Sequence, residues 1–397
     1  MKIDTSPEKI NELLSRGVEN VFPTKEFLEK ELKSGKQLTL YTGYDPTAPT
    51  LHIGHGITML KLRQFQELGH KVIMLIGDFT GMIGDPTDKT SARQKLTREQ
   101  VLENCKSYKK QASAILDFAG KNPVEVKYNS KWLAKLNFED LIELASHFTV
   151  QRMLERDMFE KRMQEEKPIY MHEFFYPLMQ GYDSVAMDVD GEVGGNDQTF
   201  NMLAGRDLMK DLKNKEKFVL TTRLLTDAGG KKMGKSEGNM VALSDGPEDM
   251  FGKVMSWSDE MIGPGFELCT RVPMDEVDDM KKDMKSGANP RDFKMRLAYE
   301  VVRTFLGDKY AKQGEEHFQK VFQEKSKPED ILEIKPSAAD IITVLVEAKI
   351  CKSKSEARQV IAQGGVKIND QKVAAIDIKV KSGDVVQKGS RFFVKIK

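Results

Sequence analysis

The spacing of apolar and polar residues predicts alternating strands and helices in the first part of the 397-residue chain. Apolar runs at 38–41 and 72–76 each lead into a loop rich in Gly, Pro and Asp, which is typical of buried strands, and 124–126 is a third candidate strand. Between them, apolar positions recur at near-helical spacing over 54–67, and a polar helix is predicted over 97–119. Strand, helix and strand in this order predict a parallel α/β sheet.

The same pattern predicts further elements on either side. Residues 1–36 are predicted to be helical and charged. Helices at 174–187 and 198–212 precede a strand-like segment at 218–225, which is rich in β-branched residues. Residues 245–325 turn helical and are rich in Met, Lys and Asp.

A linker rich in Lys, Ser and Pro begins at Lys325 and ends near Ser337. Residues 338–397 follow as a small module in which helices come first and short strands, separated by glycines, come after. At roughly 150 residues per domain, the length of the chain predicts two or three domains.

Composition excludes several classes of protein. The chain is 39% hydrophobic and 31% charged, with a mean hydropathy of −0.48, which excludes a membrane protein, a collagen-like chain and a wholly disordered one. The N-terminus has no apolar signal-peptide core. Cys105, Cys269 and Cys351 are widely spaced with no Cys-x-x-Cys, which suits a reducing cytosol and offers no zinc framework. We therefore expect a soluble, cytoplasmic protein without a bound metal.

The net charge of +1 hides an uneven distribution. Residues 338–397 contain 12 Lys and Arg against 6 Asp and Glu, a net charge of +6. The rest of the chain contains 50 basic and 55 acidic residues, a net charge of −5. A basic module on an acidic body favours an anionic partner for the module, although charge alone also fits an ordinary lysine-rich surface.

The first candidate motif is His52-Ile53-Gly54-His55, which follows a strand and a turn containing proline. Two imidazoles three residues apart lie on one side of a helix start, where backbone N–H groups attract phosphate. The glycine allows a nucleotide to approach the backbone. A zinc site would need a third ligand, which no spacing supplies. Taken alone, the motif also fits two surface histidines.

The second candidate motif is Lys232-Met233-Gly234-Lys235-Ser236, within a glycine-rich loop. Two lysines on a flexible segment can reach a polyphosphate and stabilise the charge that grows on leaving pyrophosphate. The chain has no Gly-x-x-x-x-Gly-Lys-Ser/Thr motif, so this loop is not a P-loop. Taken alone, the motif also fits a solvated basic loop.

The order of the two motifs around the predicted sheet resembles the class I aminoacyl-tRNA synthetases. Further segments narrow the resemblance to the bacterial tyrosyl-tRNA synthetases, over essentially the whole chain; they lie at 41–47, 51–55, 84–86, 176–183 and 194–198. In the last 60 residues, segments 355–361 and 364–369 resemble the small RNA-binding domain that is named after a ribosomal small-subunit protein.

The resemblance implies an α/β fold with three domains. They are a Rossmann-like parallel-sheet catalytic domain with a connective insertion at 1–240, an α-helical anticodon-binding domain at 241–330 and a small α+β RNA-binding domain at 338–397.

The resemblance also assigns roles to individual side chains. The residues implied to be catalytic are His52, His55, Lys89, Arg93, Lys232 and Lys235. Those implied to bind tyrosine are Tyr41, Asp85, Tyr176, Gln180, Asp183 and Gln198. Those implied to bind ATP are Gly43, Asp45, Thr47, Gly54, Gly195, Asp197, Lys232, Met233, Lys235 and Ser236. Those implied to bind tRNA are Lys349, Lys352, Lys354, Arg358 and Lys367.

Two of these roles have a physical basis of their own. A buried Asp183 carboxylate and the Tyr41 hydroxyl can hydrogen-bond a substrate phenol, and phenylalanine would leave them unpaired. An ammonium group needs acceptors, and Asp85 supplies a charged one. Tyr41 also fits an ordinary strand aromatic, and Asp85 an ordinary turn residue.

The implied reaction joins L-tyrosine to ATP, present with Mg²⁺ as a substrate complex, and transfers tyrosine to tRNA-Tyr. The implied assembly is a homodimer with no membrane partner. One departure from the family motif is Gly234, where a serine is usual; both lysines and Ser236 remain. The rival interpretations are a tryptophanyl-tRNA synthetase and a synthetase-derived RNA-binding protein without catalysis. The Tyr41–Asp183 pair and the terminal module speak against the first, and the intact histidines and lysines against the second.

Overall fold

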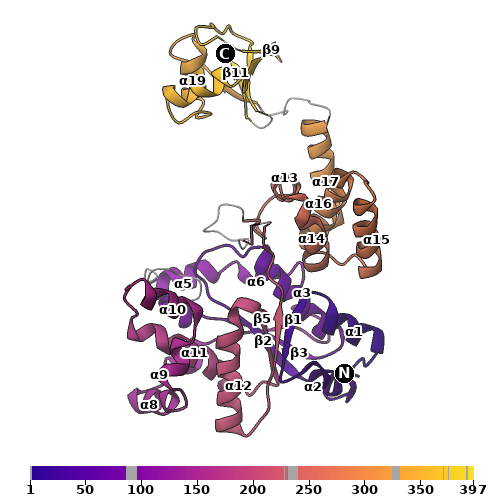
Figure 1. The fold of residues 1–397 in the computed structure, drawn as a ribbon, viewed down its shortest axis with the longest axis vertical. Coiled ribbons are helices and arrows are strands. Elements are labelled where there is room, and N and C mark those ends of the chain that lie inside the picture. Colours follow the sequence, from indigo (N-terminus) through magenta and orange to yellow (C-terminus); the bar gives the residue numbers. More distant parts are fainter. Residues whose placement is uncertain are drawn as a thin grey trace. The chain divides into compact units, whose positions relative to one another are not determined.

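The fold is taken from a computed structural model of the chain (Figure 1). It describes residues 2–85, 96–227, 229–230, 240–323, 331–369, 371–373, 375–389 and 392–397. Contacts divide the chain into two compact units, Met1–Glu315 and Glu316–Lys397, and each is treated by itself below. The finer division at 1–240, 241–330 and 338–397 stays a prediction.

The first unit is built on a six-stranded sheet with the order β1-β6-β5-β2-β3-β4. The strands are β1 (Val18–Phe22), β2 (Thr39–Tyr44), β3 (Lys71–Ile76), β4 (Glu125–Tyr128), β5 (Gly191–Gly195) and β6 (Phe218–Thr222). Pairing is parallel from β6 to β4, and β1 joins β6 in the antiparallel sense. The chain proceeds outward from β2 to β3 and β4 on one side, and from β5 to β6 on the other. Ligand sites in such sheets lie at this switch point, beyond the carboxyl ends of the strands.

Helices surround the sheet and continue beyond it. Those associated with the sheet are α1 (Pro7–Ser15), α2 (Lys25–Lys33), α3 (Ile53–Glu67), α4 (Thr80–Ile83), α5 (Arg98–Cys105), α6 (Tyr108–Ala112), α7 (Ser130–Leu133), α8 (Phe138–Ser146), α9 (Val150–Leu154), α10 (Asp157–Gln164), α11 (Met171–Met187) and α12 (Thr199–Lys213). The predicted helical stretch 245–325 contains α13 (Pro247–Met255), α14 (Ile262–Cys269), α15 (Met274–Lys285), α16 (Pro290–Leu306) and α17 (Asp308–Phe318).

Two local predictions differ from the structure. Residues 1–36 include the strand β1, whose exposed positions conceal its role at the sheet edge. The helix predicted over 97–119 is broken into α5 and α6. Tyr108, the first residue of α6, buries its ring and donates its hydroxyl to the Ala48 carbonyl at 2.7 Å, which holds α6 against the turn after β2.

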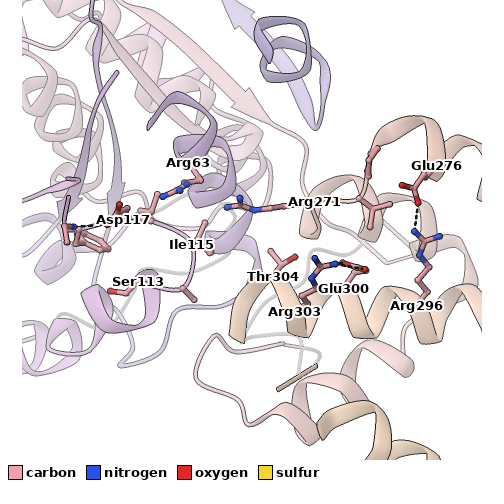
Figure 2. A pocket seen from close by; sticks show the side chains of 16 residues that line it. Arg63, Ser113, Ile115, Asp117, Arg271, Glu276, Arg296, Glu300, Arg303 and Thr304 are labelled. Atoms are coloured by element: carbon pink, nitrogen blue, oxygen red, sulfur yellow. Dashed lines mark hydrogen bonds and ion pairs between the residues drawn. The ribbon is translucent and has the colours of Figure 1, made fainter. Parts of the chain in front are cut away.

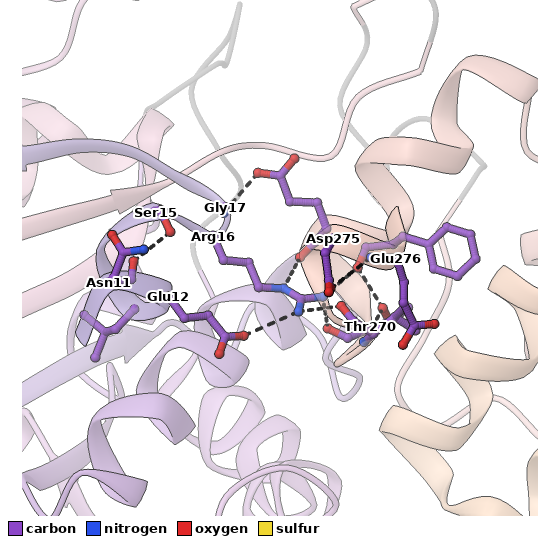
Figure 3. Close-up of polar contacts among 12 residues, drawn as sticks. Asn11, Glu12, Ser15, Arg16, Gly17, Thr270, Asp275 and Glu276 are labelled. Carbon is purple, nitrogen blue, oxygen red and sulfur yellow. Dashed lines mark hydrogen bonds and ion pairs between the residues drawn. The ribbon is translucent and has the colours of Figure 1, made fainter. Parts of the chain in front are cut away.

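A buried arginine ties the sheet part to the helical part (Figure 3). The Arg16 guanidinium follows α1 and donates to the carbonyl oxygens of four residues around the end of α14, at 2.7–2.9 Å: Phe266, Glu267, Thr270 and Val272. The buried Lys61 ammonium on α3 donates to the carbonyl oxygens of Leu13 and Arg16, at 2.8 Å each. The helix that begins at the histidine motif is therefore fixed to α1 and, through Arg16, to α14.

The second unit is a small α+β domain with its own core. Its elements are β7 (Leu332–Ile334), α18 (Ile341–Glu347), α19 (Lys354–Ala362), β8 (Val366–Ile368), β9 (Gln371–Lys372), β10 (Val385–Lys388) and β11 (Phe392–Ile396). The sheet order is β7-β11-β10-β8-β9, and β7 pairs with β11 in the parallel sense, so a strand precedes the two predicted helices. Leu345, Ile361, Val386 and Val394 are buried between sheet and helices. The predicted fold class is confirmed. Among the described helices, none combines the length and apolar character that a membrane span requires.

Candidate active site

The main candidate site is a cleft of about 410 Å³ at the switch point between β2 and β5. It is lined by the ends of these strands, the start of α3, one face of α11 and the residues after β6. The predicted site residues that line it are Tyr41, Gly43, Asp45, Thr47, His52, Gly54, His55, Asp85, Tyr176, Gln180, Asp183, Gly195, Asp197 and Gln198. The structure therefore gathers residues that are spread over more than 150 positions of sequence into one cleft.

A second hollow, of about 910 Å³, lies away from these motifs (Figure 2). It is lined by residues 113–119 and by arginines of α3, α16 and the segment after α14. Each of the four arginines makes an ion pair: Arg63 and Arg271 with Glu67, Arg296 with Glu276, and Arg303 with Glu300. We assign the chemistry to the smaller cleft, because the predicted site residues line it and the arginines of the larger hollow are held in ion pairs.

The histidine end of the cleft is organised by the start of α3. His52 is the N-cap of this helix, and its Nδ1 accepts the Gly54 N–H at 3.1 Å. His55 Nδ1 accepts the His52 N–H, also at 3.1 Å. Both rings therefore satisfy backbone N–H groups at the start of α3. The ring centroids are 3.9 Å apart. A side chain at residue 54 would place its Cβ 2.9 Å from the His52 ring, so glycine is required there.

These contacts fix the protonation of the two rings. A neutral imidazole that accepts at Nδ1 carries its hydrogen on Nε2. Burial lowers the pKa of His52 to about 4. Burial, with a contribution from His52, lowers the pKa of His55 well below the ordinary value of 6.5. In the free protein at pH 7, both rings are therefore neutral and present Nε2–H groups as donors.

The opposite end of the cleft is enclosed and polar. Asp183 on α11 is buried, and its two carboxylate oxygens accept from Trp132 Nε1 at 2.7 Å and from Asn129 Nδ2 at 3.2 Å. Burial raises the pKa of Asp183, and these two hydrogen bonds oppose the rise. Tyr41 is fully buried on β2, and its hydroxyl lies 2.9 Å from Ser184 Oγ. Burial, together with the carboxylates of Glu192 and Asp183, raises the Tyr41 pKa, so its hydroxyl stays protonated.

Two further carboxylates lie in the middle of the cleft. Asp45 accepts from Tyr176 Oη at 2.8 Å and from Thr80 Oγ1 at 2.7 Å. Asp85 accepts from Gln198 Nε2 at 2.8 Å, and the Arg156 guanidinium lies 3.7 Å from its other oxygen. Fixed acceptors of this kind suit a substrate ammonium group.

The predicted tRNA-binding residues belong to the second unit. Lys352, Lys354 and Arg358 are exposed at the start of α19, and Lys349 is exposed in the preceding turn. Lys367 lies half-buried on β8. The first four are exposed side chains before α19 and in its first five residues, and their role in tRNA binding stays a prediction.

Comparison with known proteins places the chain in a family. The model of class I tRNA synthetases (W and Y) matches residues 33–323, and the model of the tyrosine–tRNA ligase C-terminal domain matches 321–394. A tyrosine–tRNA ligase of Clostridium acetobutylicum is 45% identical over 97% of this chain and 97% of its own length. The chain belongs to the tyrosine–tRNA ligase family of class I tRNA synthetases.

Other members of the family agree with this assignment. The tyrosine–tRNA ligase of Haemophilus ducreyi is 45% identical over 98% of both chains. Among solved structures, a C-terminally truncated mitochondrial tyrosyl-tRNA synthetase of Aspergillus nidulans superposes with a TM-score of 0.68 at 22% identity, over 79% of this chain and 94% of that one. The latter likeness concerns the fold alone. The family predicted from the motifs is thus confirmed.

Some predicted residues fall outside the described part of this synthetase-family chain. They are Lys89, Arg93, Lys232, Met233, Lys235 and Ser236, and their roles stay predictions. Among the described residues, no cluster of three or more His, Cys, Asp and Glu side chains is arranged to hold a metal ion.

The structure also adds residues that motif reasoning missed: Asn129, Trp132, Ser184, Glu192 and Lys217. They contact predicted site residues without belonging to a recognisable motif; Lys217 does so through its ammonium group, which lies 5.7 Å from the centre of the Tyr41 ring. The sequence does not single out Glu192 or Lys217, because Glu192 lies close to Asp190 and Lys217 ends the charged run that begins at Lys213.

Proposed function

We propose that this chain is a tyrosine–tRNA ligase that activates L-tyrosine with ATP and then transfers it to tRNA-Tyr. The observation that carries the proposal is that the buried Tyr41–Asp183 pair and the His52–His55 pair line one cleft. The first pair offers a donor and an acceptor to a phenol hydroxyl. The second presents N–H donors at a helix N-terminus, where a nucleotide phosphate binds favourably.

The substrates are placed between these two ends. The tyrosine ring lies towards Tyr41 and Asp183, and its ammonium group is held by the acceptors around Asp85, with Tyr176, Gln180 and Gln198 completing this part of the cleft. ATP enters as its Mg²⁺ complex over Gly43, Asp45, Thr47, Gly54 and Gly195. Asp197, at the helix turn after β5, is assigned to the ribose hydroxyls.

The first step forms a bond between a tyrosine carboxylate oxygen and the α-phosphorus of ATP. The bond from this phosphorus to the oxygen that bridges to the β-phosphate breaks, and pyrophosphate leaves. No protein nucleophile is required, so the residues act by positioning and by stabilising charge. His52 and His55 donate Nε2–H groups to the phosphate oxygens. We assign Lys89, Arg93, Lys232 and Lys235 to the leaving pyrophosphate, on the family resemblance alone.

The second step transfers tyrosine to the tRNA. A ribose hydroxyl of the 3′-terminal adenosine attacks the carbonyl carbon of tyrosyl-adenylate, and AMP leaves. The basic residues of the second unit, Lys349, Lys352, Lys354, Arg358 and Lys367, hold the tRNA through its phosphates and its shape. The three free cysteines suit a reducing compartment, and we place the reaction in the cytoplasm.

ATP–pyrophosphate exchange with tyrosine, tryptophan and phenylalanine tests the first step. We expect exchange with tyrosine and weak or no exchange with the other two amino acids. Equal exchange with tryptophan would overturn the assigned specificity. No exchange with any of the three would favour an RNA-binding protein without catalysis.

A chain that ends at residue 330 tests the second unit, because β7 belongs to its sheet. This chain should retain tyrosine-dependent exchange and lose most aminoacylation of tRNA-Tyr. Undiminished aminoacylation would remove the second unit from the proposed function.

We also propose a homodimer, supported by the large exposed apolar side chains of the segment from α8 to the start of α11. Phe138, Val150 and Met171 are 77%, 66% and 68% exposed, and Ile142 and Tyr170 in the same segment are also exposed. Covering such side chains by a second copy of the chain would remove apolar area from water. Sedimentation should give twice the chain mass, and Phe138→Glu together with Ile142→Glu should give the monomer.

A further inference from the structure

A chain of buried polar groups lies directly behind Tyr41. Ser184 Oγ is 2.9 Å from Tyr41 Oη and accepts from Lys217 Nζ at 2.8 Å. Lys217 Nζ also donates to Glu192 Oε2 in a short ion pair, and Glu192 Oε1 accepts from Gln180 Nε2 at 3.1 Å. None of Tyr41, Ser184, Lys217 and Glu192 is more than 2% exposed.

The donors that each group has fix one of these hydrogen bonds and leave another open. An ammonium group has three donors and no lone pair, so Ser184 Oγ must accept from Lys217. The bond between Ser184 Oγ and Tyr41 Oη allows either hydroxyl as donor, because a serine oxygen has a second lone pair. When Ser184 donates, the Tyr41 hydroxyl hydrogen is directed away from Ser184 and is available to the cleft that Tyr41 lines.

The surrounding structure is shaped for this arrangement. Lys217 precedes β6, Glu192 lies on β5, and Ser184 lies on α11, so three elements converge on one ammonium group. Gly205 on α12 makes room for it, because a Cβ at this position would lie 2.7 Å from Lys217 Nζ and 2.9 Å from Ser184 Oγ. Burial lowers the pKa of Lys217, and the adjacent Glu192 carboxylate opposes this fall.

We propose that Lys217, held by Glu192, acts through Ser184 as a positioning residue that fixes Tyr41 as a hydrogen-bond donor to the substrate phenol oxygen. The cleft then offers one donor, Tyr41, and one acceptor, Asp183, which together match a hydroxyl and not a bare ring edge. The inference rests on the proposed function and assigns the residues that set its preference for tyrosine over phenylalanine.

A buried ion pair alone would not support this role, since many such pairs only satisfy one another. The pair of Arg162 and Glu173 illustrates the difference. This pair is also buried. Glu173 accepts from the Tyr170 N–H, and Arg162 donates to the Pro168 carbonyl, both close to the start of α11. Its contacts serve a helix end, whereas those of Lys217 lead to a hydroxyl in the cleft.

Ser184→Ala tests the relay, because it removes the link and leaves the Lys217–Glu192 pair in place. In tyrosine-dependent ATP–pyrophosphate exchange by the full chain, the KM for tyrosine should rise on the order of 3- to 10-fold, with kcat changed less than twofold. The kcat/KM for phenylalanine should not change, so the preference for tyrosine falls by the same factor. A merely structural role for Ser184 would instead lower both activities together.

A double-mutant cycle with Tyr41→Phe locates the effect. In the Tyr41→Phe background, Ser184→Ala should change the tyrosine KM less than twofold, because the hydroxyl that it orients is gone. Thr270→Val is the matched control. It removes another buried hydroxyl, which donates to the Phe266 carbonyl at 2.7 Å away from the cleft, and it should leave both KM values unchanged.

The outcomes separate this proposal from the proposed function. Loss of tyrosine-dependent exchange in the wild-type chain would overturn the function itself. Normal exchange in the wild type, with an unchanged preference for tyrosine in Ser184→Ala, would overturn the relay alone. An equally large effect of Ser184→Ala with and without the Tyr41 hydroxyl would also overturn it.

Discussion

The two ends of the cleft differ in the charge of their side chains and in how the hydrogen bonds of these side chains are satisfied. At the Tyr41–Asp183 end, charged groups are buried and satisfied within the protein: Asp183 by Trp132 and Asn129, and Lys217 by Glu192. At the histidine end, His52 and His55 are neutral, and their Nδ1 atoms accept backbone N–H groups. Their Nε2–H groups are left as donors.

The difference reflects what each end has to recognise. A phenol hydroxyl is a small neutral group, so selecting it requires a donor and an acceptor whose positions are fixed before the substrate binds. The charged groups that fix them are buried when the chain folds, and their desolvation lowers the stability of the folded protein. A phosphate brings its own charge, so its site needs only donors that are oriented beforehand. We therefore expect changes at the first end to affect stability and specificity, and changes at the second to affect pH dependence and the chemical step.

The largest expected effect comes from breaking the ion pair behind Tyr41. Lys217→Met leaves the Glu192 carboxylate buried without its partner, and should lower the free energy of unfolding by about 3–5 kcal/mol. Urea unfolding followed by circular dichroism measures this loss. Arg152→Met, which breaks an exposed pair with Asp207, is the control and should cost less than about 1 kcal/mol. Equal losses in the two variants would show that the pair behind Tyr41 is not a buried structural element.

A smaller effect should follow from filling the space beside this pair. Gly205→Ala places a Cβ within 3 Å of both Lys217 Nζ and Ser184 Oγ, and should cost about 1–3 kcal/mol and raise the tyrosine KM. Gly252→Ala on α13 is the matched control, since its Cβ would meet open space and the helix gains from alanine. A neutral Gly205→Ala variant would mean that Lys217 is less closely confined than its contacts indicate.

The sequence predicted much of the histidine end and less of the enclosed end. The histidine motif, the strand before it and the helix after it are contiguous, so local pattern and chemistry identify them together. The predicted helix over 54–67 begins one residue earlier, at Ile53, with His52 as its cap. Tyr41 was predicted only through the family resemblance, because it also fits an ordinary strand aromatic. Asp183 carried a signal of its own, since a carboxylate on a mostly apolar helix face is costly without a partner.

The supporting residues of the enclosed end could not be predicted, because their partners are distant in sequence. Ser184 lies 33 residues from Lys217 and 143 from Tyr41. Trp132 lies 51 residues from Asp183. Such contacts depend on the strand order of the sheet, and the pattern of apolar residues indicates that a parallel sheet exists without giving that order. Strand β1 was missed for a related reason, since an edge strand is only partly buried.

The buried histidines should make the free energy of unfolding fall at acid pH. The folded pKa of His52, about 4, lies below its unfolded value of 6.5, so between these pH values the unfolded chain takes up a proton that the folded chain refuses. This contribution to stability is complete above pH 6.5 and is lost as the pH falls towards 4. His52→Asn keeps an acceptor at the helix N-cap and removes the titration, so it should reduce the loss of unfolding free energy between pH 7 and pH 4 by about 3 kcal/mol. His52→Ala, which also loses the cap, should be less stable at pH 7 as well. An unchanged acid loss in His52→Asn would contradict the burial of this ring.

The smallest expected effect sharpens the assignment of Asp183 as the acceptor for the phenol. Trp132→Phe removes the N–H that donates to Asp183 Oδ1 at 2.7 Å and keeps most of the ring packing. The tyrosine KM should rise about 3- to 10-fold, as expected for one hydrogen bond. Since the bond from Trp132 lowers the pKa of Asp183, its loss favours the protonated acid, and the defect should shrink as the pH is raised. Trp257→Phe, at a buried site in the helical part, should leave the tyrosine KM unchanged. A defect of equal size at every pH would mean that Trp132 shapes the pocket without tuning the charge of Asp183, and Asn129 would then be the donor that tunes this carboxylate.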